Sequence, residues 1–273
     1  MENTPNTQAA ELTGNVLFYK NPQPLNPEQH AGLGVKQIAE PFSFLRSAHA
    51  IPVTVTEFGM AAASYPIIFV GEQFTPVAVM GVRSGENLYV SQDGQMDPDF
   101  YLPAFVRRYP FVFANDNNSD RLLLCIDRDA PMVTNIQPDM PLFENNEPTP
   151  FTQNAIEFCQ EFERQRRSTE EFVGIVRGLG LFEQKTVNFQ SRDPQGNPVG
   201  EQQKIADYWA IDENKLNALT DDQFNQLRTN GAIGAIYAHL LSLLNWQRVI
   251  NRALSQQTEQ TQAQAAPTEA PVA

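Results

Sequence analysis

The chain has 273 residues and a net charge of −13, with 19 Lys and Arg against 32 Asp and Glu. A chain of this length can bury a sizeable core in one large domain or in two smaller ones. Phosphate binding requires clustered positive charge, so the acidic balance argues against a nucleic-acid partner.

The beginning of the sequence lacks the basic and apolar regions of a secretory signal, and no apolar run reaches the roughly 18 residues that a membrane span requires. Cys125 and Cys159 do not form a Cys-x-x-Cys pair, and we expect them to be buried, reduced thiols. These observations predict a cytoplasmic protein without a membrane span. Export by a route without a cleaved signal stays open.

Both ends of the chain are polar. Residues 1–14 and the Gln-, Ala-, Thr- and Pro-rich stretch 255–273 are predicted to be disordered, because they contain too little apolar surface to offset the entropy of ordering. Between them we expect a single domain at 15–254. By its predicted secondary structure, this domain has a β-rich part at 15–147 and a helix-rich part at 148–254 that contains one hairpin.

Two Tyr-Pro pairs, at Tyr65 and Tyr109, each open an apolar run that is typical of a strand. A short helix is predicted before each pair, and a turn and a second strand after it, so the first half contains a duplicated helix-hairpin unit. The turns are predicted at Gly85–Asn87 and Asn115–Ser119. The predicted strands are Val16–Tyr19, Ile67–Val70, Val77–Val82, Leu88–Ser91, Phe111–Ala114 and Leu122–Asp127.

The second half has helical patterns. Thr149 before Pro150 predicts a capped helix start, and the apolar face of that helix continues until Gly178. The capping-box pattern Ser168–Glu171 indicates a break or a second start within it. A hairpin is then predicted from the runs Lys185–Gln190 and Gln203–Ile211.

A second capping box, Thr220 with Gln223, predicts a helix at Asp221–Arg228. The strongest helical pattern follows, and we expect its broad apolar stripe to face the core. The stripe consists of Ile233, Ile236, Tyr237, Leu240, Leu241 and Leu244. The chain as a whole is therefore predicted to be an α+β protein, with an antiparallel, β-rich first half and a mainly helical second half.

Few residues have the spacing that catalysis requires. The three histidines form no local ligand pair, so we predict no metal site, and no glycine-rich phosphate loop indicates a nucleotide or another cofactor. Asp127 and Asp129 place two carboxylates at the end of a predicted strand. They could bind a cation or raise a pKa, or they could form a turn with local hydrogen bonds.

The remaining candidates are single side chains. His30, in a polar turn, could be catalytic or could simply make turn hydrogen bonds. His239 and Trp246 are seven positions apart and share a helix face, which could pack on a sheet or stack on a ligand. Arg107 and Arg108, beside Tyr109, could hold a carboxylate or a phosphate.

Several long motifs, in the same order, resemble the bacterial SapC family. They are Phe18–Asn26 with His30–Gly32, Tyr101–Phe111, Leu124–Asp127, Glu147–Pro150 and Tyr237–Trp246. The resemblance covers about residues 15–250. It implies an association with bacterial surface layers, from which the family takes its name, and a link to TonB-dependent receptors and flavin-dependent halogenase-like proteins. It implies no catalytic residues.

Three functional hypotheses follow. The first is a non-enzymatic binding or accessory protein of the cell surface or of TonB-dependent uptake, with a protein partner and with Arg107, Arg108, Tyr109 and Trp246 as ligand-binding residues. The second is an accessory enzyme in nutrient uptake or natural-product modification. It would use the candidates His30, Asp127, Asp129 and His239 together with the two arginines. The third is a surface-layer subunit.

Overall fold

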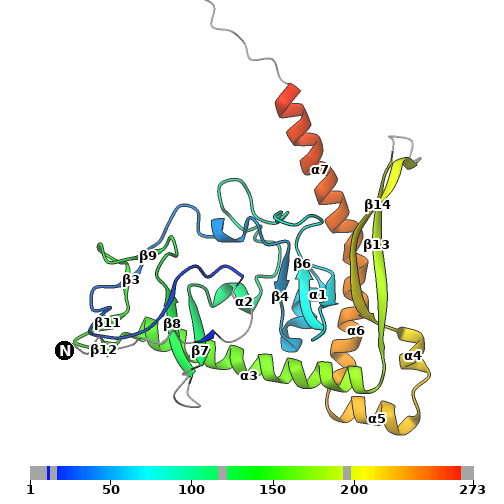
Figure 1. Cartoon of the computed structure of the whole chain (residues 1–273), viewed down its shortest axis with the longest axis horizontal. Helices are drawn as coiled ribbons and strands as arrows, with labels where there is room; N and C mark the ends of the chain where they lie inside the picture. Colours follow the sequence, from blue (N-terminus) through cyan, green and yellow to red (C-terminus); the bar gives the residue numbers. More distant parts are fainter. Residues whose placement is uncertain (1–10, 13–16, 116–121, 193–197, 266–273) are drawn as a thin grey trace, which may run out of the picture. The chain divides into compact units, whose positions relative to one another are not determined.

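The computed structural model describes residues 11–12, 17–115, 122–192 and 198–265 (Figure 1). The chain forms two compact units. Unit 1 comprises Met1–Leu45, Val90–Met96 and Leu102–Ser168, and unit 2 comprises Arg46–Tyr89, Asp97–Tyr101 and Thr169–Ala273. The chain passes between the units several times, so this division differs from the boundary at 147 that the texture of the sequence suggests.

The described strands of unit 1 are short. They are β1 (Glu11–Leu12), β2 (Pro22–Pro24), β3 (Gly34–Val35), β7 (Phe111–Asn115), β8 (Leu122–Asp127), β9 (Val133–Thr134), β10 (Met140–Pro141), β11 (Phe143–Glu144) and β12 (Glu147–Pro148). They form sheets with the strand orders β1-β7-β8-β2, β10-β3-β9 and β11-β12. All of these pairs are antiparallel.

The hairpin of β7 and β8 divides the core of unit 1 into two sides. Successive side chains of a strand point to opposite faces. Phe111 and Phe113 accordingly pack into the main buried cluster. Val112 and Ala114 pack with Cys125 into a smaller one. Both sides of this sheet are therefore covered.

One long helix, α3 (Pro150–Gly178), begins where the sequence predicts. The Thr152 N–H donates to Thr149 Oγ1 (3.3 Å), which caps the first turn. The helix ends at Gly178, and Gly180 follows with a left-handed φ of +68°.

The break predicted at Ser168–Glu171 is wrong, because α3 continues through it. A capping box requires a hydroxyl that accepts a hydrogen bond from its own helix. The Thr169 hydroxyl instead accepts a hydrogen bond from the Val55 N–H (2.9 Å). Thr169 therefore holds a neighbouring segment, and the helix continues through this position.

Unit 2 is built on a five-stranded antiparallel sheet in the order β13-β14-β5-β6-β4. Its strands are β4 (Ala50–Pro52), β5 (Ile67–Val70), β6 (Thr75–Val79), β13 (Phe182–Arg192) and β14 (Pro198–Ile211). The long β13–β14 hairpin appears where the sequence predicts it. It joins β5 through the pairing of Trp209 with Phe69.

The helices of unit 2 are α1 (Phe58–Ala62), α4 (Glu213–Asn217), α5 (Asp221–Thr229), α6 (Ala232–Ser242) and α7 (Trp246–Ala265). The capping box predicted at the start of α5 is confirmed. The Gln223 N–H donates to Thr220 Oγ1 (3.4 Å), and the Gln223 side chain accepts from the Thr220 N–H (3.1 Å).

With these helices and antiparallel sheets, the chain is an α+β protein, as its sequence predicts.

Each Tyr-Pro pair lies between a short helix and an antiparallel hairpin. In unit 2, α1 precedes Tyr65-Pro66, and β5 and β6 follow. In unit 1, α2 (Ala104–Arg107) precedes Tyr109-Pro110, and β7 and β8 follow.

Two details differ from the expected hairpins. The hairpin of β5 and β6 turns at Gly71–Phe74, and no hairpin of the described strands forms about the connection predicted at Gly85–Asn87. Leu88–Ser91 contributes an isolated bridge from Val90 to Met96 instead of a strand. The predicted turn Asn115–Ser119 lies largely outside the described residues.

Of the two stretches predicted to be disordered, most of 1–14 lies outside the described ranges, whereas 255–265 belong to α7. Within those ranges, β1 pairs with the edge of β7, where backbone groups are available. At the other end, α7 extends to Ala265, since the Gln- and Ala-rich stretch before Pro267 consists of good helix formers.

The prediction for the apolar stripe of α6 is wrong for three of its residues. Tyr237, Leu241 and Leu244 are 40%, 63% and 78% exposed, although Ile236 is fully buried. The buried face of this helix instead includes polar residues that hydrogen-bond to the ends of strands.

Candidate functional site

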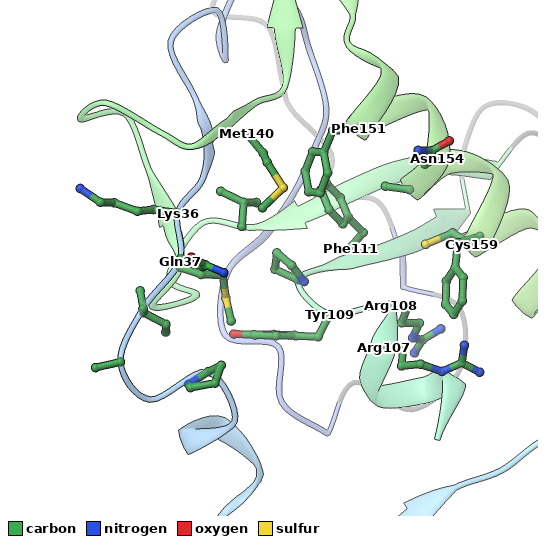
Figure 2. A pocket seen from close by; sticks show the side chains of 18 of the residues that line it. Lys36, Gln37, Arg107, Arg108, Tyr109, Phe111, Met140, Phe151, Asn154 and Cys159 are labelled. Atoms are coloured by element: carbon green, nitrogen blue, oxygen red, sulfur yellow. The ribbon is translucent and has the colours of Figure 1, made fainter. Parts of the chain in front are cut away.

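Unit 1 contains a cavity of about 760 Å³ (Figure 2). Segments that are far apart in the sequence form its wall, namely 35–39 with Pro41, Gln95, 107–111, Met132, Met140 and the first turns of α3. Most of the lining side chains are apolar. Ligand pockets typically measure about 300–1,000 Å³, so the cavity can accommodate a small organic molecule.

The helix α3 contributes one face to this wall. Phe151, Ala155 and Phe158 lie four and three positions apart, so they point to the same side of the helix. The sequence identifies this apolar face correctly, but as core. In the structure these residues line the cavity, together with the thiol of Cys159.

The opposite part of the wall follows α2, a single helical turn. It closes with a hydrogen bond from the Arg108 N–H to the Ala104 carbonyl (3.1 Å). Arg107 is the last residue of this turn, Arg108 and Tyr109 follow it, and all three line the cavity. The structure thus brings together three of the four residues that the sequence suggests as ligand-binding.

Arg107 is exposed and has a defined position. Its Nε donates to the Leu102 carbonyl (3.1 Å), and its guanidinium carbon lies 5.2 Å from the centroid of the Phe158 ring. A hydrogen bond together with a ring contact restricts the side chain, so its charge stays at this end of the cavity.

Arg108 is buried, with 3% of its surface exposed. Its guanidinium carbon lies 4.4 Å from the ring centroids of Phe105 and Phe162, and 5.8 Å from that of Tyr19. Cations on aromatic faces are stabilised most strongly where water is excluded. The cavity therefore has a desolvated positive charge in its wall.

Tyr109 connects the cavity to Asp127. Its ring stacks on Phe44 (centroids 4.2 Å apart), and its hydroxyl donates to Asp127 Oδ2 (3.3 Å). Burial and, next, the Asp127 charge raise the pKa of the Tyr109 hydroxyl. The phenol therefore stays protonated and acts as a hydrogen-bond donor.

Asp127 is fully buried, and both of its oxygens accept hydrogen bonds. Oδ1 accepts from the N–H groups of Asn21 (2.8 Å) and Asp129 (3.2 Å), and Oδ2 accepts from the Lys20 N–H (3.0 Å). The exposed Asp129 contacts the Asn21 amide (3.3 Å). The bond from the Asp129 N–H is local, as in the turn that the sequence left open, whereas the bonds from Lys20 and Asn21 come from a segment distant in the sequence. Among the described residues, no group of three His, Cys, Asp or Glu is placed to hold a metal ion.

Cys159 lies in the cavity wall as a thiol. Burial raises its pKa to about 12, although the nearby positive charge of Arg108 acts in the opposite direction. A thiol is nucleophilic only as thiolate, so Cys159 is unreactive at neutral pH.

His30 is buried in unit 1 and does not line the cavity. Its Nδ1 accepts a hydrogen bond from the Asn26 N–H (3.1 Å), which places the ring proton on Nε2. Burial, followed by the charge of Arg128, lowers the pKa of the ring. The geometry is that of a turn histidine.

His239 lies in unit 2, fully buried on α6. Its Nε2 accepts from the Ile211 N–H (3.0 Å), so Nδ1 has the proton and donates to the Ile67 carbonyl (2.9 Å). The neutral ring thereby links β14 to β5. Burial lowers its pKa to about 4. Trp246, the fourth suggested ligand-binding residue, is also in unit 2 and packs against Tyr208 (centroids 5.7 Å apart).

Sequence reasoning missed the other side of the cavity. Met132 and Met140 approach it because β9 and β10 both pair with β3. These pairings join residues about 100 positions apart, and no local sequence pattern predicts them. Only the apolar character of the residues was visible in advance.

The fold and the cavity define an α+β protein with a small-molecule-sized pocket in one of its two units. Comparison with family models matches residues 25–249 to the family described as SapC, and the chain belongs to this family. No curated protein and no solved structure matches it. None of the described helices combines the length and the apolar character needed to cross a membrane.

Proposed function

We propose that this SapC-family chain is a binding protein that holds a small, largely apolar molecule in the cavity of unit 1. The observation on which the proposal depends is the cavity itself. It measures about 760 Å³ and is lined by Phe111, Met132, Met140 and Phe151 among other apolar side chains. Removing apolar ligand surface from water would supply the affinity.

The state of the nearby reactive groups favours binding over catalysis. Catalysis requires a nucleophile or a proton-transfer group that is free to react. Cys159 is held protonated, and the oxygens of Asp127 already accept several hydrogen bonds. His30 does not line the cavity, and His239 lies in the other unit.

The setting that we propose for this binding is the one implied by the sequence resemblance. A protein that captures a small molecule fits an accessory role at the bacterial cell surface or in TonB-dependent uptake, in which it would deliver the molecule to a protein partner. Crosslinking in cells, with and without the ligand, tests this part separately. Failure to recover an envelope or receptor component would remove the setting and leave the binding function untouched.

The binding function can be tested with N-phenyl-1-naphthylamine, a neutral apolar dye whose emission rises when it leaves water. We expect the full-length chain to bind the dye with saturation at one site. Ala155→Phe should abolish this binding, because the half-buried Ala155 lies in the cavity wall and a larger ring would fill the space.

The matched control is Gln153→Phe, which adds the same ring to an exposed position of α3 outside the lining. It should bind the dye as the unmodified chain does. Equal dye binding by both variants, or no dye binding by the unmodified chain, would refute the proposal.

A further inference from the structure

The charged side chains that line the cavity are positive, whereas the net charge of the whole chain is negative. The whole protein has a net charge of −13. The charged side chains that line the cavity are Lys36, Arg107 and Arg108, and its lining contains no Asp or Glu. The local excess of positive charge is unexpected in a chain with 32 acidic and 19 basic residues.

Two of the three cations are at the same end. Figure 2 shows Arg107 and Arg108 near Cys159 at one end of the pocket, whereas Lys36 and Gln37 lie at the other. The Lys36 side chain points away from the aromatic residues, so the arginine end determines the charge inside. Tyr109, Phe111, Phe151 and Met140 form the apolar part between the two ends (Figure 2).

The acidic groups nearest to the cavity have partners of their own. Asp127 accepts hydrogen bonds from backbone N–H groups and from Tyr109. Asp139 accepts from the Gln37 N–H (2.9 Å), and Glu163 pairs with Arg166 (2.8 Å). These contacts offset part of their charge. The charge of Glu163 still acts on Cys159, but more weakly than that of Arg108.

The field of the arginine end reaches the cavity wall. The charge of Arg108 acts on Cys159 and on Tyr19, favouring the anionic form of each, although burial outweighs it in both cases. A negative group of a ligand at the same end would experience the same attraction. The burial of Arg108 strengthens this interaction relative to bulk solvent.

We infer that the ligand is a monoanionic amphiphile, with its carboxylate or an equivalent acidic group at the Arg107–Arg108 end and its apolar body along Tyr109, Phe111 and Phe151. This inference rests on the proposed function and specifies its ligand class. Arg107 is the exposed cation at this end, and its guanidinium group can form paired hydrogen bonds with a carboxylate. A charge-assisted interaction of this kind changes affinity by about tenfold or more.

A set of three ligands with the same apolar chain separates charge from apolar burial. Decanoate and decylammonium, each below its critical micelle concentration, and decanol, below its solubility limit, compete with N-phenyl-1-naphthylamine for the full-length protein. We expect decanoate to displace the dye at a concentration about tenfold lower than decanol, and decylammonium to be the weakest competitor.

Two variants test whether Arg107 causes the preference for decanoate over decanol. Arg107→Gln should reduce the affinity for decanoate about tenfold and leave that for decanol unchanged. Arg164→Gln is the control, because it removes the same charge from an exposed position of α3 outside the lining. It should preserve the difference between the two ligands.

The outcomes distinguish the two proposals. Equal competition by the three ligands, or an Arg107→Gln variant that still prefers decanoate tenfold, would overturn the anionic ligand class and leave the apolar binding site in place. Absence of dye binding by the unmodified chain would overturn both.

Discussion

Lowering the pH below 6.5 is expected to destabilise the folded chain through His239. The ring is neutral in the fold, because Nε2 accepts from the Ile211 N–H (3.0 Å) while the Nδ1 proton goes to the Ile67 carbonyl (2.9 Å). A second proton on Nε2 would point at that N–H group and break the link between β14 and β5. Protonation therefore favours the unfolded chain.

The size of the effect follows from the difference in pKa between the two states. Each pKa unit corresponds to about 1.4 kcal/mol, so a shift from 6.5 to about 4 contributes on the order of 3 kcal/mol. This contribution is complete above pH 6.5 and is lost as the pH falls toward 4, because the unfolded chain binds the proton more tightly. His30, whose pKa is also lowered, adds a contribution of the same sign.

Urea unfolding, followed by the fluorescence of Trp209 and Trp246, measures this loss at several pH values. His239→Gln keeps a donor and an acceptor but does not titrate, so its free energy of unfolding should fall less steeply between about pH 6.5 and 4.5, by up to roughly 1.4 kcal/mol per pH unit. The control His49→Gln changes an exposed histidine and should follow the unmodified chain.

Comparison of the slopes removes the contribution of His30, which is present in all three proteins. A His239→Gln variant with the same pH slope as the unmodified chain would show that His239 does not titrate as the buried geometry requires. The reasoning about its neutral state would then be refuted.

The remaining predictions concern stability at neutral pH. Asp127→Asn should lower the free energy of unfolding by about 1–3 kcal/mol, because the buried carboxylate accepts several N–H bonds; a change below about 0.5 kcal/mol in urea unfolding would contradict this. Ser242→Ala should cost about 1–3 kcal/mol, since its hydroxyl accepts from the Ile67 N–H (2.9 Å), and faster amide hydrogen exchange at Ile67 would accompany the loss. Leu241→Gln should change stability by less than about 0.5 kcal/mol, whereas Ile236→Ala should cost about 2–5 kcal/mol in thermal unfolding; the reverse order would contradict the orientation of α6.

Short-range signals in this sequence predict the fold well. Thr149 before Pro150 and Thr220 with Gln223 mark helix starts, because capping depends on residues three or four positions apart. The hairpin of β13 and β14 is equally local. The capping pattern at 168–171 fails because these residues lie inside α3, where Thr169 bonds to the distant Val55 N–H.

The stripe on α6 fails for a different reason. The apolar pattern assigns Tyr237, Leu241 and Leu244 to the core, but the helix turns polar groups inward. Ser242 accepts a hydrogen bond from the Ile67 N–H and His239 donates one to the Ile67 carbonyl, at the first residue of β5. A buried backbone group without a partner costs more than an exposed leucine, so satisfying the strand determines which face is buried.

The candidate site, too, depends on contacts between distant segments that a local sequence pattern does not reveal. The sequence singles out Arg107, Arg108 and Tyr109, because charged and aromatic residues stand out beside an apolar strand. It does not reveal Met140 or Phe151 as cavity residues, since a side chain that faces an empty space and one that faces a neighbour have the same local pattern. The cavity exists only once distant segments have assembled.

The net charge excludes fewer partners than it first suggests. At physiological ionic strength, charges more than about 8 Å apart in solvent are largely screened from one another. The acidic surface therefore repels a polyanion that must lie along it, but hardly weakens the field of Arg107 and Arg108 at the cavity wall, where Arg108 is buried. A chain with a net charge of −13 can thus disfavour nucleic acid and still select a small ligand with a single negative charge.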